Sequence, residues 1–415
     1  MTYIEFFDNN VTENICASLV KAPDKVILIG SSRKVLDRHV ERYRELFLSH
    51  GHDVEFVAKS VNKNDMKGVV ATLSEIIETN DDCVIDLTGG EDVYLVAIGI
   101  VSERYKHKNI QMHRFNLANG TIIDCDGDNN VLEETESPKL TVREGVRVYG
   151  GDVVYGAVDE DATYEWILDE EFKNDIRAMW SVCKRNVKAW NTQISILGTI
   201  EKIGTVEELS SVVSVKSIKE QLAKSDYGFF VDFGVLGPLR QMGLLDYMST
   251  PEVFGVTYKN EQVKRCLTKA GQALEMIIYI TAKEVTEKNG EPTYNDVMNG
   301  VRIDWDGEIH SDVNAHEVEN EIDVIMMRGI VPVFVSCKNG RVDMNELYKL
   351  DSVAERFGGR YARKIFVATA LEFAGDFSEY FRQRAEEMNI CLIDDVQKMD
   401  EKELYKTVRS FWSRS

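Results

Sequence analysis

Residues 26–33 read VILIGSSR, and this stretch decides the class of fold. Four apolar residues followed by Gly30 predict a buried strand that ends in a turn. After the turn, apolar residues recur at positions 36, 40, 43 and 47, which is the period of a helix packed on a sheet. A buried strand that leads directly into an amphipathic helix is the repeating unit of α/β folds.

The same unit recurs through the first 125 residues. Strands are predicted at 26–30, 54–57, 83–87, 110–115 and 121–125, and helices at 36–47, 66–77 and 91–104. This order predicts a mainly parallel sheet with helices on both faces, which is a Rossmann-like arrangement. The acidic stretch at 124–136 is predicted to be a loop or linker.

The remainder of the chain divides into two further parts. Helical patterns from about residue 160 lead to a helix at 235–245 and strand-like runs at 253–258 and 262–267, which indicate a winged-helix module or a helical spacer that dimerises. A long helix is then predicted from 268 to 289, strands at 301–305, 320–327, 331–338 and 365–368, and helices at 345–357 and 376–388. We therefore predict an α/β protein with parts at 1–145, 146–267 and 268–415.

Composition limits the location and the partners. The 415 residues are 44% hydrophobic and 29% charged, which is typical of a soluble globular protein. No apolar run reaches the roughly 18 residues of a membrane span, and the first residues, MTYIEFFDNN, do not resemble a secretory signal. Seven cysteines without a CxxC pair indicate reduced thiols. We expect a cytoplasmic protein without a membrane partner.

Charge and histidine spacing exclude two further classes. The net charge of −21 disfavours a protein that coats long stretches of duplex, although it allows a nuclease with a local basic path. The seven histidines show no metal-ligand spacing, so the sequence predicts no zinc site.

A first candidate site follows two strands of the N-terminal sheet. Open parallel sheets bind ligands at the carboxyl ends of their strands, where glycines allow a close approach and helix N-termini face anions. The alternative is that both segments are ordinary tight turns and helix caps. The candidate ligand-binding residues are Gly30, Ser31, Ser32, Arg33, Thr88, Gly89 and Gly90.

These two segments, ILIGSS at 27–32 and DLTGG at 86–90, resemble the CARF domain of type III CRISPR ancillary proteins. The resemblance covers about the first 140 residues. It implies a homodimer that binds cyclic tetra- or hexa-adenylate across its two-fold interface, with cyclic tetra-adenylate as the activator. Glu91 and Asp92 depart from the family, in which many members carry threonine and a basic residue.

A second candidate site lies on two strands of the C-terminal part. In the run NEIDVI at 320–325, strand alternation places Glu321 and Asp323 on one face, and in VPVFVSCK at 331–338 it places Ser336 and Lys338 on one face. A carboxylate beside a lysine at paired strand ends can hold Mg²⁺ or Mn²⁺ and orient a hydrolytic water. The alternative is a cross-strand ion pair between Asp323 and Lys338.

Glu275 borders the apolar stripe of the helix predicted from residue 268, so it can point at the sheet. Together, Glu275, Asp323 and the run SCK at 336–338 resemble the PD-(D/E)xK nuclease core. The resemblance implies that Glu275, Asp323 and the Cys337 carbonyl bind the metal ion and that Lys338 is the catalytic lysine. The departure is Ser336, which stands where the superfamily carries an acid; Glu321 and Glu346 are candidates to replace it.

The predicted function is metal-dependent cleavage of single-stranded DNA or RNA, activated by a cyclic oligoadenylate, in type III CRISPR antiviral defence. One alternative is a ligand-responsive transcription regulator, which the single basic residue of 235–245, Arg240, disfavours. The other is a sensor whose nuclease domain is inactive, which Ser336 favours.

Overall fold

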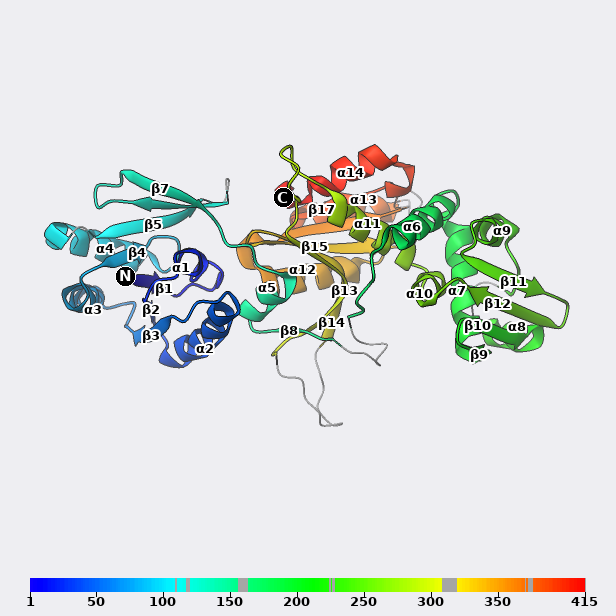
Figure 1. Cartoon of the computed structure of the whole chain (residues 1–415), viewed down its shortest axis with the longest axis horizontal. Helices are drawn as coiled ribbons and strands as arrows, with labels where there is room; N and C mark the ends of the chain where they lie inside the picture. Colours follow the sequence, from blue (N-terminus) through cyan, green and yellow to red (C-terminus); the bar gives the residue numbers. More distant parts are fainter. Residues whose placement is uncertain are drawn as a thin grey trace.

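Three β-sheets follow one another along an elongated molecule (Figure 1). The computed structural model describes residues 1–108, 110–116, 120–155, 163–223, 225, 228–307, 319–369, 371 and 376–414. The N-terminal sheet lies at one end, a small sheet from the middle of the chain lies at the other end, and the C-terminal sheet lies between them. Among the described residues, no helix is both long enough and apolar enough to cross a bilayer.

The N-terminal sheet has seven strands. In spatial order they are β3 (Glu55–Ser60), β2 (Lys25–Gly30), β1 (Thr2–Phe6), β4 (Cys83–Asp86), β5 (Gln111–Asn116), β6 (Thr121–Cys125) and β7 (Val131–Glu136). Pairing is parallel from β3 to β5 and antiparallel from β5 to β7. This is the predicted doubly wound sheet, with an antiparallel extension at one edge.

Helices cover both faces of this sheet because its strands alternate between two apolar clusters. Tyr3 and Leu28 belong to the cluster that includes α1 (Cys16–Lys21) and α2 (Arg33–Ser49). Ile4 and Ile27 belong to the cluster that includes α3 (Met66–Thr79) and α4 (Asp92–Arg104). A short 3-10 helix, η1 (Lys106–Lys108), follows α4.

Two elements of this sheet differ from the sequence prediction. β1 was not predicted, yet it lies in the centre of the sheet between β2 and β4. The stretch at 124–136 was predicted to be a loop, but it contains the edge strand β7, which pairs with β6. Most side chains of β7 are exposed, so backbone pairing rather than apolar burial holds this strand in place.

The middle of the chain forms helices and a four-stranded antiparallel sheet. The helices are α6 (Glu170–Cys183), α7 (Val187–Ile203), α8 (Val215–Leu222), α9 (Phe233–Gln241) and α10 (Glu261–Thr268). The strands, in spatial order, are β11 (Leu245–Ser249), β12 (Val253–Tyr258), β10 (Ser210–Ser214) and β9 (Thr205–Glu207).

The strand predicted at 262–267 was wrong, because these residues belong to α10. Asn260 caps this helix by accepting a hydrogen bond from the backbone of Val263. The apolar residues Val263, Cys266 and Leu267 share one buried face, and their spacing is helical. The predicted long helix from 268 to 289 is also shorter, because α11 spans Gln272–Glu284.

The C-terminal sheet has six strands. In spatial order they are β17 (Ile390–Ile393), β16 (Arg363–Ala368), β15 (Val331–Lys338), β14 (Glu319–Arg328), β13 (Asp296–Asp304) and β8 (Asp152–Val153). Pairing is antiparallel from β8 to β15 and parallel from β15 to β17. β8 precedes the middle part in sequence, whereas the other strands follow it.

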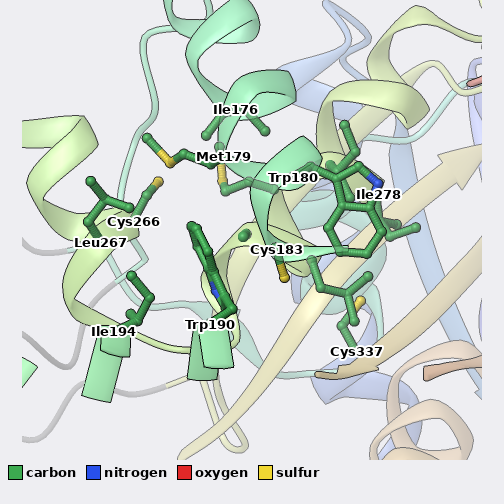
Figure 2. Packing of buried hydrophobic residues seen from close by; sticks show 14 of the residues in the cluster. Ile176, Met179, Trp180, Cys183, Trp190, Ile194, Cys266, Leu267, Ile278 and Cys337 are labelled. Carbon is green, nitrogen blue, oxygen red and sulfur yellow. The ribbon is translucent and has the colours of Figure 1, made fainter. Parts of the chain in front are cut away.

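The two faces of this sheet pack against different parts of the molecule. One face joins α6, α7, α10 and α11 in a single apolar cluster, to which Trp180, Trp190, Ile278 and Cys337 all belong (Figure 2). The other face packs with α5 (Val142–Val148), α12 (Met344–Gly358) and α13 (Asp376–Glu387), and its cluster continues into the N-terminal sheet. Further short elements are η2 (Gly359–Tyr361), η4 (Val396–Lys398), α14 (Glu401–Arg409) and η5 (Phe411–Ser413).

A polar contact also joins the N-terminal and C-terminal sheets. The backbone N–H of Arg360, in η2, donates to Oδ1 of Asn10 over 2.9 Å. The guanidinium of Arg360 and the hydroxyl of Tyr361 both contact Glu13. The segment that follows β1 is thus tied to the segment that precedes β16.

Candidate functional site

Asp323 lies where the hydrogen-bond ladders on both sides of β14 are interrupted. The ladder between β14 and β15 ends at the pair Val324 and Val335. Beyond it, Oδ2 of Asp323 accepts a hydrogen bond from the backbone N–H of Cys337 over 2.6 Å and one from Oγ of Ser336 over 3.3 Å. The strands therefore separate at this point, and the carboxylate occupies the fork between them.

On the other side of β14, the ladder with β13 omits Asp323 and Gly300. Gly300 has a positive φ of 59°, a conformation that glycine adopts without strain. The side-chain amide of Asn299 donates to the backbone carbonyl of Asp323 over 2.8 Å. Ile322 and Val324 consequently pack on opposite faces of the sheet. Strand alternation breaks at this point, yet Glu321 and Asp323 both act on the charges of Lys269 and Glu275, so the two carboxylates lie at one site.

Glu275 approaches this fork from α11. Its residue is only 4% exposed, and Oε2 accepts a hydrogen bond from Gln272 over 3.1 Å. Burial, followed by the charge of Asp323, raises the pKa of Glu275 to about 8. Burial also raises the pKa of Asp323. Each of these two buried carboxyl groups disfavours ionisation of the other, so a bound cation would stabilise the ionised forms of both.

Lys269 brings positive charge to the same site. Its Nζ lies 2.9 Å from Oε1 of Glu321 and 3.7 Å from Oε2 of Glu275. Burial lowers the pKa of Lys269, but the carboxylates of Glu275 and Glu321 outweigh this effect and raise it. Burial would raise the pKa of Glu321, but Lys269 and then Arg302, 3.1 Å away, hold it below its usual value. Glu321 is therefore already paired with two cations.

The structure does not support the predicted alternative of an ion pair between Asp323 and Lys338. Within the described part of the chain, Nζ of Lys338 pairs with Oε2 of Glu346, on α12, over 3.1 Å. Lys338 still lies close enough to lower the pKa of both Glu275 and Asp323, although burial outweighs its effect. The lysine side chain is 30% exposed, so its ammonium group remains accessible from solvent.

The side chain of Cys337 lies on the opposite side of its strand from Lys338. It is buried in the apolar cluster with Trp180 and Ile278 (Figure 2). Burial raises the pKa of its thiol well above the usual range, which leaves it protonated and unreactive. Only the backbone of Cys337 is available to the fork.

Glu321 lies near Glu275 and Asp323, but Lys269 and Arg302 neutralise it, so two carboxylates remain for a cation at the fork. Ser336 donates to Asp323, and the two candidates for a third acid, Glu321 and Glu346, form ion pairs with Lys269 and Lys338. Among the described residues, a close group of three ligand-type side chains occurs instead in the N-terminal sheet. A cation at the fork would thus be held by two side chains, with backbone oxygen or water completing its shell.

The candidate ligand site of the N-terminal sheet lies at the carboxyl ends of three strands. The two predicted loops were expected to follow adjacent strands, but β1 lies between β2 and β4. The segment after β1 therefore belongs to the same edge. It carries Asp8, whose Oδ2 accepts a hydrogen bond from Gly90 over 3.3 Å. Asp8 was not predicted as a site residue, because β1, the strand that precedes it, was not predicted.

The loop after β4 is fixed by short contacts. The backbone N–H of Thr88 donates to Asp86 over 2.8 Å, and Oγ1 of Thr88 accepts from the backbone of Phe115 over 3.0 Å. Gly90 has a φ of 98°, and a Cβ atom there would lie 2.7 Å from Phe6. A Cβ atom at Gly89 would lie 3.2 Å from the carbonyl oxygen of Phe6. Both glycines are thus required by the close approach of β1.

The loop after β2 is open. Ser31, Ser32 and Arg33 are exposed, and Arg33 opens α2. The guanidinium of Arg33 bonds to Asp37 over 2.8 Å and to the carbonyl of Ala58 over 2.7 Å. Gly30 packs against Leu36, whose Cδ2 would lie 2.9 Å from a Cβ atom at Gly30. The two serine hydroxyls are therefore the accessible polar groups of this loop.

These features define an α/β protein that combines a doubly wound sheet, open at its carboxyl edge, with a carboxylate and lysine site on a second sheet. The predicted α/β class is confirmed. No known family model matches the chain, and no curated protein matches it.

Solved structures share this fold over the whole chain. Can2 from Sulfobacillus thermosulfidooxidans, determined in complex with cyclic tetra-adenylate, is 14% identical, with a TM-score of 0.66 over 99% of both chains. Protein VC1899 from Vibrio cholerae is 16% identical, with a TM-score of 0.72 over 99% of this chain and 98% of its own. A type III CRISPR defence DNA nuclease activated by cyclic oligoadenylate reaches a TM-score of only 0.48, over 89% of this chain and 45% of its own. The chain thus has the fold of Can2.

Proposed function

We propose that the chain is a metal-dependent nuclease that a cyclic oligoadenylate activates. Its substrate is single-stranded DNA or RNA, and its role is type III CRISPR antiviral defence. The observation that carries this proposal is the buried pair of carboxyl groups at the fork, Glu275 and Asp323, with Lys338 beside them. A fold alone does not define an activity, but buried carboxyl groups with raised pKa values are typical of functional sites.

Each group at the fork has a separate task. Glu275, Asp323 and the backbone carbonyl of Cys337 would hold Mn²⁺ or Mg²⁺, and Gln272 and Asn299 hold the two acids in place. The ion supplies charge neutralisation at the phosphodiester and lowers the pKa of a water molecule. Lys338 faces the phosphate and stabilises the charge that develops on it. Glu346 keeps the lysine extended along the end of its strand.

The N-terminal sheet supplies the sensor. Can2 is described with cyclic tetra-adenylate, and the carboxyl edge of this sheet offers Ser31, Ser32, Thr88 and Gly89 to a comparable ligand. An exposed apolar stripe on α4, formed by Leu95, Val96 and Ile100, adjoins this edge. A second copy of the chain would cover the stripe and bring two ligand edges together about a two-fold axis.

We keep the layout of sensor, connecting module and nuclease, with divisions after residues 145 and 267, as part of this proposal. α5 and α10 run across these two positions. The connecting module joins the apolar cluster of the nuclease sheet through α6, α7 and α10.

The decisive experiment measures cleavage of a labelled single strand, as DNA and as RNA, with Mn²⁺ or Mg²⁺ and with or without cyclic tetra-adenylate. We expect cleavage only when both the metal ion and the activator are present. Asp323→Asn should abolish cleavage while leaving activator affinity unchanged, because it removes a charge that the cation requires. Cleavage by this variant at the rate of the unmodified chain would refute the site.

Lys338 and Lys349 form a matched pair for the same assay, because both contact Glu346, over 3.1 and 4.0 Å. Lys338→Ala should lower the cleavage rate by on the order of 10²–10³, by analogy with the loss of one oxyanion donor. Lys349 lies one helical turn away from Glu346, and the Lys349→Ala variant should cleave at the normal rate. Equal rates for the two variants would assign Lys338 to stability alone.

The same assay tests the alternative that the chain is a sensor whose nuclease domain is inactive. If the chain binds cyclic tetra-adenylate but cleaves no strand with either metal ion, the serine at position 336 has removed a required ligand. Ser336→Asp or Ser336→Glu would then be expected to restore metal binding.

A further inference from the structure

A row of ionisable side chains crosses the N-terminal sheet on the face that α1 covers. Asp86 on β4 lies opposite His113 on β5, and His113 lies opposite Asp124 on β6. β1 pairs in register with β4 up to the preceding residue, so Glu5 is the neighbour of Asp86. The ligand atoms of Glu5, Asp86 and His113 all lie within 4.8 Å of one another. This group is separate from the fork of the C-terminal sheet.

The group is enclosed, and its polar atoms are not satisfied. Glu5, Asp86 and His113 are exposed by 0%, 1% and 1%. Within the described part of the chain, neither carboxylate oxygen of Glu5 and neither ring nitrogen of His113 has a hydrogen-bond partner. Buried polar groups without partners are rare and call for an explanation.

The contact between His113 and Asp86 indicates what is missing. Nε2 of His113 lies 3.1 Å from Oδ1 of Asp86, which is close enough for a hydrogen bond. Among the described residues, neither ring nitrogen of His113 has a hydrogen-bond partner of good geometry. Two ligand-type groups that lie this close without bonding to each other are arranged as ligands of one shared ion.

Charge along the row leads to the same conclusion. At its outer end, Nζ of Lys21 lies 2.7 Å from Asp124 and 2.6 Å from Glu133, so both carboxylates contact a cation. At its inner end, Glu5 and Asp86 lie side by side, and the ionisable group next to them that could carry positive charge is the imidazole of His113. Burying two neighbouring carboxylates is unfavourable unless positive charge compensates them.

We propose that Glu5, Asp86 and His113 bind a divalent transition-metal ion of the Zn²⁺ class inside the N-terminal sheet. Carboxylate oxygens with an imidazole nitrogen are typical ligands of Zn²⁺, whereas Mg²⁺ and Ca²⁺ take oxygen ligands. Histidine spacing in the sequence predicted no zinc site, because these ligands come from three separate strands that meet only in the parallel sheet.

The ion would act on the ligand loop above it. Oδ1 of Asp86 accepts the backbone N–H of Thr88 over 2.8 Å, and Thr88 in turn bonds to the backbone of Phe115. An ion that fixes Asp86 therefore fixes the beginning of the loop that leads to Gly89 and Gly90. The site is structural, and it does not depend on the proposed nuclease.

The test uses the full chain with Glu275→Gln and Asp323→Asn, so that the fork contributes no bound ion. After chelation, the protein is dialysed to equilibrium against micromolar Zn²⁺, and its zinc content is measured by mass spectrometry. We expect one ion per chain. Glu5→Gln or His113→Gln, added to this parent, should weaken Zn²⁺ binding by at least about tenfold. Glu133→Gln, on the same row but paired with Lys21, should not weaken it.

Three results would overturn the proposal. The first is a parent chain that binds no Zn²⁺. This result overturns the proposal even if the Glu5→Gln and His113→Gln variants fail to fold. The second is a Glu5→Gln variant that binds Zn²⁺ as tightly as the parent. The third is a zinc-free parent whose melting temperature falls on Glu5→Gln, since a proton shared between Glu5 and Asp86 would then hold the cluster. If the unmodified chain shows no cleavage, that result concerns the fork and not this site.

Discussion

The carboxyl group of Glu275 lies at the base of the fork, and its surroundings favour the protonated form. Burial and the nearby Asp323 raise its pKa to about 8. A metal ion needs the charged form of its ligand, so the ion must displace this proton. Metal affinity at the fork is therefore linked to pH.

We expect the affinity of the fork for Mn²⁺ to increase with pH, by up to about tenfold per unit, until it levels off near pH 8. Calorimetric titrations between about pH 6 and pH 9, on either side of that pKa, measure this slope. The Glu5→Gln variant serves as the parent, so that the N-terminal site contributes nothing. An affinity that does not change with pH would contradict the burial of Glu275.

The same group links pH to the stability of the metal-free protein. Because the folded pKa lies above the unfolded one, stability is lost as pH rises from about 4.5 towards about 8. Glu275→Gln removes this loss, so its melting temperature should exceed that of the unmodified chain at pH 8 but not at pH 5. The difference between the two pH values is the internal control.

At the level of elements, the sequence predicted the helices and strands whose apolar residues recur in a regular pattern because one or both of their faces are buried. β14 and β15 were found because their apolar runs are long, and α2 and α3 were found because their apolar stripes are regular. The sequence did not predict β7, whose side chains are mostly exposed. Backbone hydrogen bonds with β6 stabilise this strand, and such bonds produce no regular pattern of apolar residues in the sequence.

The candidate site was predictable in part for the same reason. Asp323 and Lys338 could be found because each lies in a strongly patterned strand. The fork itself could not be predicted, since it requires Gly300 on a different strand and the side chain of Asn299. Lys269 was missed because it lies in the short gap between α10 and α11, whereas the prediction placed it in the first turn of a helix from 268 to 289.

The exposed stripe on α4 makes a prediction about assembly. Leu95, Val96 and Ile100 are exposed by 47%, 55% and 41%, and a dimer would bury them. Ile100→Glu should convert a dimer into a monomer in analytical ultracentrifugation, because it places a charge in an apolar interface. Leu48→Glu, at an equally exposed apolar position on α2, is the matched control and should remain dimeric. A monomeric unmodified chain would contradict the two-fold sensor.

At the scale of the whole molecule, the segment after β1 connects the two sheets. Asp8 bonds to Gly90 at the ligand edge, and Asn10 bonds to Arg360, which leads into β16. β16 pairs with β15 up to Lys338. A movement of the ligand loop can therefore reach the strand that carries the lysine through contiguous contacts.

Asn10→Ala tests this connection, because it removes the acceptor for the backbone of Arg360. We expect activation by cyclic tetra-adenylate to fall by between about two- and thirtyfold. Affinity for the activator should stay close to its original value, because Asn10 acts through its contact with η2. Asn9→Ala, at the exposed neighbouring position, should change neither quantity. An equal loss of affinity in both variants would assign the segment to ligand binding rather than to coupling.

The pairing of β8 with β13 also has a consequence for synthesis on the ribosome. Residues 152–153 leave the exit tunnel early, but their partners at 303–304 emerge only after the whole middle part has been made. The sensor sheet, by contrast, is complete within the first 136 residues. A nascent chain would therefore contain every strand of the N-terminal sheet before it contains Asp323 and Lys338, which are translated later. Under the proposed function, such an order would delay any cleavage of nucleic acid until the sheet that binds the activator has been made.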